Sequence, residues 1–343
     1  MTSSTAPERD PVLPPRAGEL AEHLRAELRE TDGDLYVKSR FLAEEMDHVT
    51  LGGGKRVRPT LTLLVCEAAG GLDADPSSDA ADVNTYPETA LDFAAGIELV
   101  HNASLVVDDI IDRSDVRRGT PSAWAAFGHG PAIVASDGLL GEAFALFSAD
   151  ARATEVVADA MVELGEGEAM ELVDRPTDTA EYMELARRKT GALFRAAAQL
   201  GAIAADAEDA TVEGVGEYAE RVGIAFQLRD DVLDATAASE TLGKPAGQDA
   251  EIGRPSILQV TEKTPDAVEE LAREQATEAA AALDSVDLPG DEARGYLEDL
   301  AAFVVERVAP NGTVIETLEV YGDESVRVVR GNATNATSAT RGG

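Results

Sequence analysis

The stretch Leu105–Gly119, LVVDDIIDRSDVRRG, places several carboxylates in an apolar run and follows them with paired arginines. The apolar periodicity of Leu91–Asp112 predicts one long helix, with Asp108 and Asp112 one turn apart on the same face. Their Cβ atoms would be about 5–6 Å apart. Because the surrounding residues are apolar, the two negative charges would repel each other, and a cation is expected between them. Mg2+ commonly combines one or two carboxylates with phosphate oxygens. For this motif alone, a solvated acidic face is an equal alternative.

The arrangement occurs again in FQLRDDVLD, where Asp230 and Asp234 are one helical turn apart. Helices that carry such motifs can face each other across a helical bundle and bind metal between them. Two copies in one chain are poorly explained by chance.

Basic residues stand at a few selected positions. The glycine-rich segment GGGKRVRP carries Lys55, Arg56 and Arg58, which suits close approach of a phosphate. Other basic positions follow the acidic motifs or open the segment KTGALF, and they are Arg117, Arg118, Lys189 (with Thr190 beside it) and Lys244. A solvated surface cation is the alternative at each position alone. Together, metal-binding carboxylates and fixed cations predict a ligand that carries a diphosphate.

The elements that position these residues are expected to be helices. Apolar residues recur three and four apart amid much Ala, Leu and Glu, which predicts an all-α fold with breaks at 71–88, 174–180, 235–249 and 284–292. Roughly 290 residues approach the limit of one hydrophobic core, so a single large helical domain is expected over 19–308. Residues 1–18 and the end of the chain read as disordered, and alternation within 309–343 predicts a short hairpin around Gly322 and Asp323.

The composition excludes several classes of protein. The formal net charge is -36, from 65 acidic against 29 basic residues, which disfavours nucleic acid as a partner. A hydrophobic content of 44% disfavours a disordered acidic chain. With one cysteine, no run of membrane-span length and no secretion signal, we expect a cytoplasmic protein, and the acidity suggests a cytoplasm rich in salt.

Together, GGKRVRP, IELVHNASLVVDDIIDRSDVRRGTPSAW, KTGALF and FQLRDDVLDATAASETLGKPAGQD resemble the trans-polyprenyl diphosphate synthases, over about Leu20–Val308. The resemblance implies a bundle of long helices around a central cavity, usually in a homodimer. It also implies Mg2+-dependent condensation of isopentenyl diphosphate with an allylic diphosphate, in which ionisation of the allylic C–O bond precedes attack by the double bond.

The resemblance assigns roles residue by residue. Asp108, Asp112 and Asp230 would bind Mg2+, with Asp109 and Asp234 in support. The isopentenyl diphosphate would be held by Lys55, Arg58, His101 and Arg118. The allylic diphosphate and its metals would be held by Arg117, Lys189, Thr190, Gln227 and Lys244.

The sequence departs from the family at Val107 and Trp124, where histidine is common, and at Arg254, where lysine is common. In the family that the chain resembles, the residues four and five before the first aspartate can form the floor of the cavity, where a bulky aromatic side chain stops the growing product. Here they are Ser104 and Ala103, which are small, as are the deeper Gly96 and Ala95, so this helix leaves the end of the cavity open. We therefore expect a product of at least four isoprene units, shortened by Ala103→Phe. Geranylgeranyl diphosphate is the first expectation, and a C25 or quinone side-chain precursor the alternative.

Three other readings remain. A class I terpene cyclase also ionises allylic diphosphates, but it has no use for GGKRVRP or for a second acidic motif. A non-catalytic partner subunit is disfavoured by the intact motifs. An acidic helical scaffold that binds cations would take up Mg2+ regardless of diphosphate.

Overall fold

The computed structural model describes residues 40–51, 56–74, 84–236, 254–305, 314–321 and 325–331. These residues are mostly helical. The helices are α2 (Arg40–Leu51), α3 (Val57–Ala68), α4 (Glu88–Asp112), α5 (Ala123–Phe127), α6 (His129–Phe147), α7 (Ala151–Leu172), α8 (Thr179–Ala186), η1 (Arg187–Gly191), α9 (Ala192–Ala204), α10 (Asp209–Thr236), α13 (Ile257–Thr261), α14 (Pro265–Asp284) and α15 (Asp291–Val305). The strands form three antiparallel pairs, β1 (Asp73–Ala74) with β2 (Asn84–Thr85), β3 (Val116–Arg117) with β4 (Thr120–Pro121), and β5 (Val314–Tyr321) with β6 (Ser325–Gly331).

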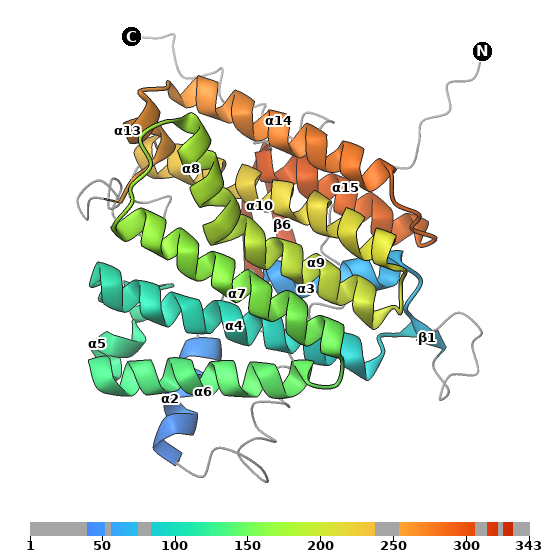
Figure 1. The fold of residues 1–343 in the computed structure, drawn as a ribbon, viewed down its shortest axis with the longest axis horizontal. Helices are drawn as coiled ribbons and strands as arrows, with labels where there is room; N and C mark the ends of the chain where they lie inside the picture. The colour runs from blue at the N-terminus through green and yellow to red at the C-terminus, as the bar shows by residue number, and fades with distance from the viewer. Residues whose placement is uncertain are drawn as a thin grey trace, which may run out of the picture.

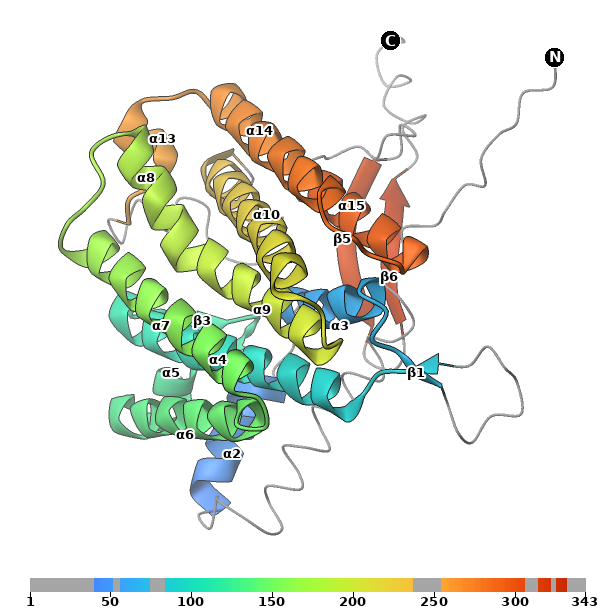
Figure 2. The ribbon, with the colours of Figure 1, turned by 45° about the vertical axis from the view of Figure 1, so that its right-hand side comes forward.

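The long helices form a bundle with α9 at its centre. Helix α9 packs against α3, α4, α7 and α10, while α6 packs against α4 and α14 against α10. From the bottom to the top of Figure 1 the long helices run α6, α4, α7, α9, α10 and α14, and Figure 2 shows the same order from another side. The all-α fold predicted from the sequence is confirmed.

Local sequence explains where several helices begin. Asp150 accepts hydrogen bonds from the backbone N–H groups of Arg152 and Ala153 at the start of α7, and Asp178 caps α8 in the same way. Thr264 caps α14, with Pro265 at its first position. Such caps satisfy N–H groups that have no partner inside the helix.

The central core is apolar and is assembled from most of the long helices. Phe93, Phe147 and Phe194 are fully buried, and the Phe93 and Phe147 rings lie 6.0 Å apart between α4 and α6. Gly96 makes room for this contact, because a Cβ atom there would lie 2.6 Å from the Phe147 ring.

Two helices meet the length and composition of a membrane span, although no such span was expected. They are α4 and α6, whose apolar windows are 67% and 39% buried inside the protein. Core helices of soluble proteins pass the same test, so this is weak evidence for a span.

The strands β5 and β6 coincide with the alternating stretches noted in the sequence, and Tyr321 pairs with Ser325. Residues 1–18 and the last residues of the chain, expected to be disordered, lie outside the described residues.

Candidate active site

The C-terminal half of α4 carries most of the predicted site. His101, Ser104, Asp108 and Asp112 follow one another at spacings of three and four residues, so they share one face of this helix. The helix ends at Asp112, because Arg113 adopts a left-handed conformation with φ 56°. The site therefore lies at the end of a helix that is otherwise part of the core.

Two cations pair with carboxylates of α4 and α7 near the end of α4. The Arg254 guanidinium binds the Asp112 carboxylate through two N–H groups, with Nε 2.9 Å from Oδ1, and lies 3.8 Å from Glu171. Lys189 Nζ pairs with Glu171 and lies 2.8 Å from Glu168 Oε1. Helices α4 and α7, the turn η1 and the segment before α13 thus meet at one acidic cluster.

The charges in this cluster shift the titration of its members. The pKa of Glu168 is raised to about 7, chiefly by burial and also by the charges of Asp108 and Glu171, against the opposing effect of Lys189. Burial also raises the pKa of Asp112 despite Arg254. These shifts show that the carboxylates repel one another in a poorly solvated site, which is what a divalent cation would relieve.

A hydrogen-bonded chain connects this cluster to the second acidic motif. Thr190 Oγ1 lies 2.7 Å from Gln227 Oε1, and Gln227 Nε2 donates to Asp231 Oδ1 at 3.0 Å. Asp231 also accepts from Tyr182 Oη at 2.5 Å and from the Ile257 N–H at 3.0 Å. These hydrogen bonds bring together Thr190, which follows Lys189, and Gln227, all three of which the resemblance assigns to the allylic diphosphate.

The aspartates assigned to metal in the second motif differ in their surroundings. Asp230 is exposed, whereas Asp234 is 6% exposed. Asp231, which lies between them and was given no role, is the aspartate bound to Gln227. Burial raises its pKa to about 6.

An arginine cluster lies one to two turns before the acidic cluster. The Arg58 guanidinium lies 4.7 Å from the centre of the Phe194 ring, and its buried Nε has no hydrogen-bond acceptor among the described residues. Arg56 binds the buried Glu98 on α4 and the Thr50 carbonyl. A buried donor without an acceptor in a positive environment suits an anionic ligand.

His101 lies within this cluster. Burial lowers its pKa well below 6.5, and the charges of the surrounding arginines lower it further; these are Arg58, Arg118, Arg117 and Arg56. The neutral imidazole is therefore the stable form in the absence of an anion.

The arginine pair after the first acidic motif sits on a tight hairpin. Arg118 and Gly119 have φ values of 53° and 79° between β3 and β4, the combination that a two-residue hairpin turn requires. Arg117 turns back to Asp109, with Nη2 2.6 Å and Nε 3.0 Å from Oδ1. A pocket beside the hairpin is lined by Asn102, Asp109, Arg117, Arg118 and Ser122 among others.

The donor chemistry of the acidic cluster fits magnesium, although no set of three ligands is preassembled among the described residues. Asp108, Asp112, Glu168 and Glu171 supply only oxygen atoms, the ligands that hard cations prefer. Asp109 and Asp112 are each bound to an arginine, Arg117 and Arg254 respectively, so either carboxylate would exchange an arginine for a metal on direct ligation.

Several residues of the site were not singled out by the sequence analysis as site residues. Glu168 and Glu171 were concealed among 65 acidic residues, and Glu98 within an apolar run. Arg254 was noted only as a departure from the family. Lys55 and Lys244, predicted to bind the diphosphates, lie outside the described residues.

Comparison with known proteins places this chain in a family. A sequence profile described as "Polyprenyl synthetase" matches residues 39–286. The chain is 34% identical to the geranylfarnesyl diphosphate synthase of Aeropyrum pernix over 281 residues, which cover 76% of this chain and 83% of the relative.

Solved structures share the architecture. The geranylgeranyl pyrophosphate synthetase of Pyrococcus horikoshii is similar with a TM-score of 0.72 and 32% identity, covering 85% of this chain and 97% of that one. The geranylgeranyl pyrophosphate synthase of Corynebacterium glutamicum, in complex with isoprenyl diphosphate and magnesium, has a TM-score of 0.71 at 26% identity, covering 85% and 98%. The chain thus belongs to the polyprenyl synthetase family of prenyltransferases, with the all-α isoprenoid synthase fold.

Proposed function

We propose that this prenyltransferase condenses isopentenyl diphosphate head-to-tail with an allylic diphosphate in a Mg2+-dependent reaction. The observation that carries the proposal is the pair of clusters on one face of α4. Asp108 and Asp112 meet Lys189 and Arg254 at the end of the helix. His101 lies among arginines two turns earlier. One cluster suits a metal-bound diphosphate, and the other suits a diphosphate held by cations alone.

The allylic diphosphate belongs at the acidic cluster. Lys189, Thr190 and Gln227 approach it from η1 and α10, and Arg117 and Lys244 complete the set that the resemblance implies. Isopentenyl diphosphate belongs with Arg58, His101, Arg118 and Lys55. The short distance along α4 between the two groups would bring the allylic carbon close to the double bond that attacks it.

The residues of the chain favour loss of the allylic diphosphate by their charge. Asp108, Asp112 and Asp230 would hold Mg2+, which would supply Lewis-acid stabilisation of the negative charge on the leaving group. Lys189 and Arg254 add fixed positive charge beside the same group, which stabilises the developing diphosphate more than the intact ester. The isopentenyl double bond attacks the carbocation, and a proton then passes to the released diphosphate.

For the product we propose geranylgeranyl diphosphate, with geranylfarnesyl diphosphate or a longer chain as the alternative. The Pyrococcus horikoshii structure is named for the first product and the Aeropyrum pernix relative for the second. Gly96, which left the end of the cavity open in the sequence analysis, packs against Phe147 of α6. A side chain from α6 therefore fills the space that α4 leaves there.

We also propose that the protein acts in a cytoplasm rich in salt, as its acidity suggests.

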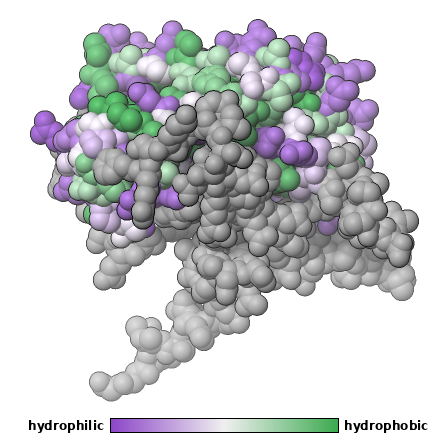
Figure 3. All heavy atoms as spheres, turned by 90° about the horizontal axis from the view of Figure 1, so that it is seen from below, coloured by the Kyte–Doolittle hydropathy of each residue, from purple (hydrophilic) through white to green (hydrophobic). Residues whose placement is uncertain are grey.

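We further propose a homodimer joined along α6. Helix α6 buries Leu139 and Ala143 on one face and exposes Ile133 and Val134 by 50% and 53% on another. It is the lowest long helix in Figure 1, and Figure 3 shows apolar surface among hydrophilic surface on the part of this side that grey residues leave visible. An apolar helix with one uncovered side suits contact with a second copy.

The experiment that tests the function is an elongation assay. The purified protein is incubated in Mg2+ and high KCl with isopentenyl diphosphate and, in separate reactions, dimethylallyl, geranyl or farnesyl diphosphate, and products are identified by mass. We expect a ladder that ends at one length. Folded protein that binds Mg2+ but elongates no primer would favour a non-catalytic partner subunit or scaffold.

A further inference from the structure

The turn that carries Lys189 and Thr190 is a π-helix, wider than the α-helices on either side. In η1 (Arg187–Gly191) the N–H of Ala192 bonds to the carbonyl of Arg187, five residues back instead of four. One extra residue is thus accommodated between α8 and α9. Such turns are rare and are found frequently at functional sites, so something must hold this one in place.

Backbone contacts fix the position of the turn from two sides. A Cβ atom on Gly167 of α7 would lie 2.9 Å from Lys189 N, and one on Gly223 of α10 would lie 3.0 Å from Gly191 Cα. The neighbouring helices therefore approach the turn closely. Because both contacts involve glycine, which has no side chain, they do not determine which side chains of the turn point toward α7 and which toward α10.

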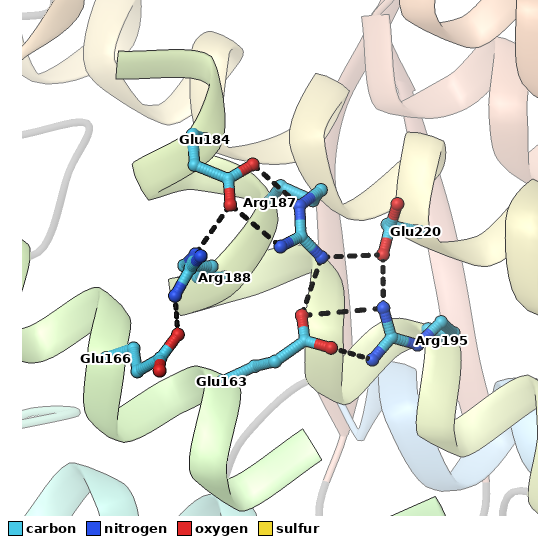
Figure 4. Close-up of polar contacts among 7 residues, drawn as sticks. All are labelled: Glu163, Glu166, Glu184, Arg187, Arg188, Arg195 and Glu220. Carbon is cyan, nitrogen blue, oxygen red and sulfur yellow. Dashed lines mark hydrogen bonds and ion pairs between the residues drawn. The ribbon is translucent and has the colours of Figure 1, made fainter. Parts of the chain in front are cut away.

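Two arginines bracket the turn and share the same two carboxylates (Figure 4). Arg187, its first residue, donates from Nη1 to Glu163 Oε2 at 2.6 Å and to Glu220 Oε2 at 3.4 Å. Arg195, four residues beyond its end, donates to Glu163 Oε1 and to Glu220 Oε2, both at 2.5 Å. Glu184 binds Arg187 through both oxygens, at 2.8 and 2.9 Å.

The two arginines and the two carboxylates that they share are partly buried, with 20–26% of each side chain exposed; these residues are Arg187, Arg195, Glu163 and Glu220. Burial alone would raise the pKa of Glu163, but Arg195 and Arg187 hold it below its usual value. The carboxylate therefore stays ionised between the two guanidinium groups at neutral pH.

The geometry of the turn is what allows the sharing. Residues eight apart in a regular α-helix differ by about 80° around the axis, so Arg187 and Arg195 would point in different directions. The π-turn accommodates one extra residue, so Arg187 and Arg195 are oriented like residues seven apart in a regular α-helix. Their directions around the axis then differ by only about 20°. This register aligns both arginines closely on the side of the helix that faces Glu163 and Glu220.

We propose that Arg187, Arg195, Glu163 and Glu220 are positioning residues that lock the register of η1, and thereby hold Lys189 at the acidic cluster and Thr190 at Gln227. The inference rests on the proposed function, because the residues that it positions are those assigned to the allylic diphosphate. A slip to the α-helical register would rotate one side of the turn by about 100° relative to the other. Lys189 and Thr190 would then no longer both reach their partners.

Glu163→Gln is the test, and Glu166→Gln is its matched control. The glutamine keeps the size of the side chain but presents an N–H₂ group to one of the guanidinium groups. Glu166 lies on the same helix, is 55% exposed and pairs only with Arg188 within this network. Both variants are compared with the unaltered protein for the KM of each substrate and for amide hydrogen exchange across residues 187–196.

For Glu163→Gln we expect the KM of the allylic diphosphate to rise about tenfold or more, since small displacements of positioning groups are costly. The KM of isopentenyl diphosphate, whose described residues Arg58, His101 and Arg118 lie on α3, α4 and the β3–β4 hairpin, should change less than about twofold. Exchange across 187–196 should accelerate. Glu166→Gln should match the unaltered protein in all three measurements.

Equal effects of the two variants, or an equal rise in both KM values, would overturn the proposal. If Glu163→Gln does not fold, Arg195→Lys decides by the same measurements, since one ammonium group cannot span two carboxylates as a guanidinium does. Failure of the unaltered protein to elongate any primer would refute the proposed function instead. The exchange measurement would still show whether the network holds the turn.

Discussion

Ser104 and Ala103 are neighbours on α4 but face different surroundings. Ser104 is partly exposed and lies one turn before Asp108 on the same face. Ala103 is 1% exposed, and its carbonyl accepts a hydrogen bond from Ser136 Oγ of α6 at 3.2 Å. The sequence alone favoured Ala103 as the position that controls product length, but its burial against α6 makes Ser104 the better candidate.

We therefore predict that Ser104→Phe shortens the product by at least one isoprene unit. Ala103→Phe should instead overpack the contact with α6 and cost about 1–3 kcal/mol of stability. Product masses and thermal unfolding of both variants check the prediction, with Ser104→Ala as the control. A stable Ala103→Phe variant with a shortened product, beside an unchanged Ser104→Phe product, would contradict it.

His101 should respond to the diphosphate through its protonation. Its pKa is held well below 6.5 by burial and by the neighbouring arginines, so it is neutral in the unliganded protein. The negative charge of bound isopentenyl diphosphate offsets the arginines and raises this pKa, so binding near pH 6 should take up a proton. Calorimetry in buffers of different ionisation enthalpy measures the uptake. His101→Asn should abolish it, and binding without dependence on the buffer would disprove the assignment.

The lowered pKa of His101 also makes the stability of the unliganded protein depend on pH. Because the folded pKa lies below the unfolded value, protonation of His101 favours the unfolded chain. The stability that the neutral imidazole contributes is complete above pH 6.5 and declines as the pH falls toward the folded pKa. Unfolding midpoints between pH 7 and 5 should therefore fall less steeply in His101→Asn than in the unaltered protein.

At the scale of elements, helix α6 offers a direct test of assembly. Its exposed Ile133 and Val134 belong to an apolar helix whose other face is already packed on α4. Changing Ile133 to Asp should shift the protein from dimer to monomer in light scattering, because a charge at an apolar interface is left without a partner. Ala281→Asp, exposed on α14 at the opposite edge of the bundle, is the matched control. Unchanged mass in both variants would exclude this face as the interface.

Helix ends could be predicted from the sequence where nearby residues determine them, but not where residues of other helices do. The helix expected to end at Asp112 does end there. The predicted breaks at 174–180 and 284–292 overlap the breaks between α7 and α8 and between α14 and α15. These boundaries arise from caps and turn residues within a few positions. The π-turn at Arg187–Gly191 was not predicted, because its register depends on Glu163 and Glu220 from other helices.

The residues of the site also fall into those that local sequence brings together and those that only the packing of the helices brings together. Asp108 and Asp112 were identifiable from spacing because one helix holds both. Their partners, Arg254 and Glu171, come from distant segments, and only the packing of α4 against its neighbours brings them together. In a chain with 65 acidic residues, a glutamate carries no information until its surroundings are known.

For the whole molecule, the net charge of -36 sets the conditions under which the fold is stable. Repulsion among exposed carboxylates acts over a Debye length, which falls from about 10 Å at 0.1 M salt to about 3 Å at 1 M. Partly buried groups such as Glu163 and Arg195 are screened much less than exposed ones. Salt should therefore remove unfavourable interactions at the surface while the network of Figure 4 keeps most of its strength.

The unfolding midpoint should accordingly rise as KCl increases to molar concentrations. A variant with Glu155, Glu213 and Glu274 changed to Gln, all exposed, should need less KCl for the same midpoint, because its surface repels itself less. An uncharged osmolyte at the same osmolality separates screening from general stabilisation by excluded solutes. Equal stability at low and multimolar KCl would remove the argument for a salt-rich compartment, since a protein stable without screening gives no reason to infer one.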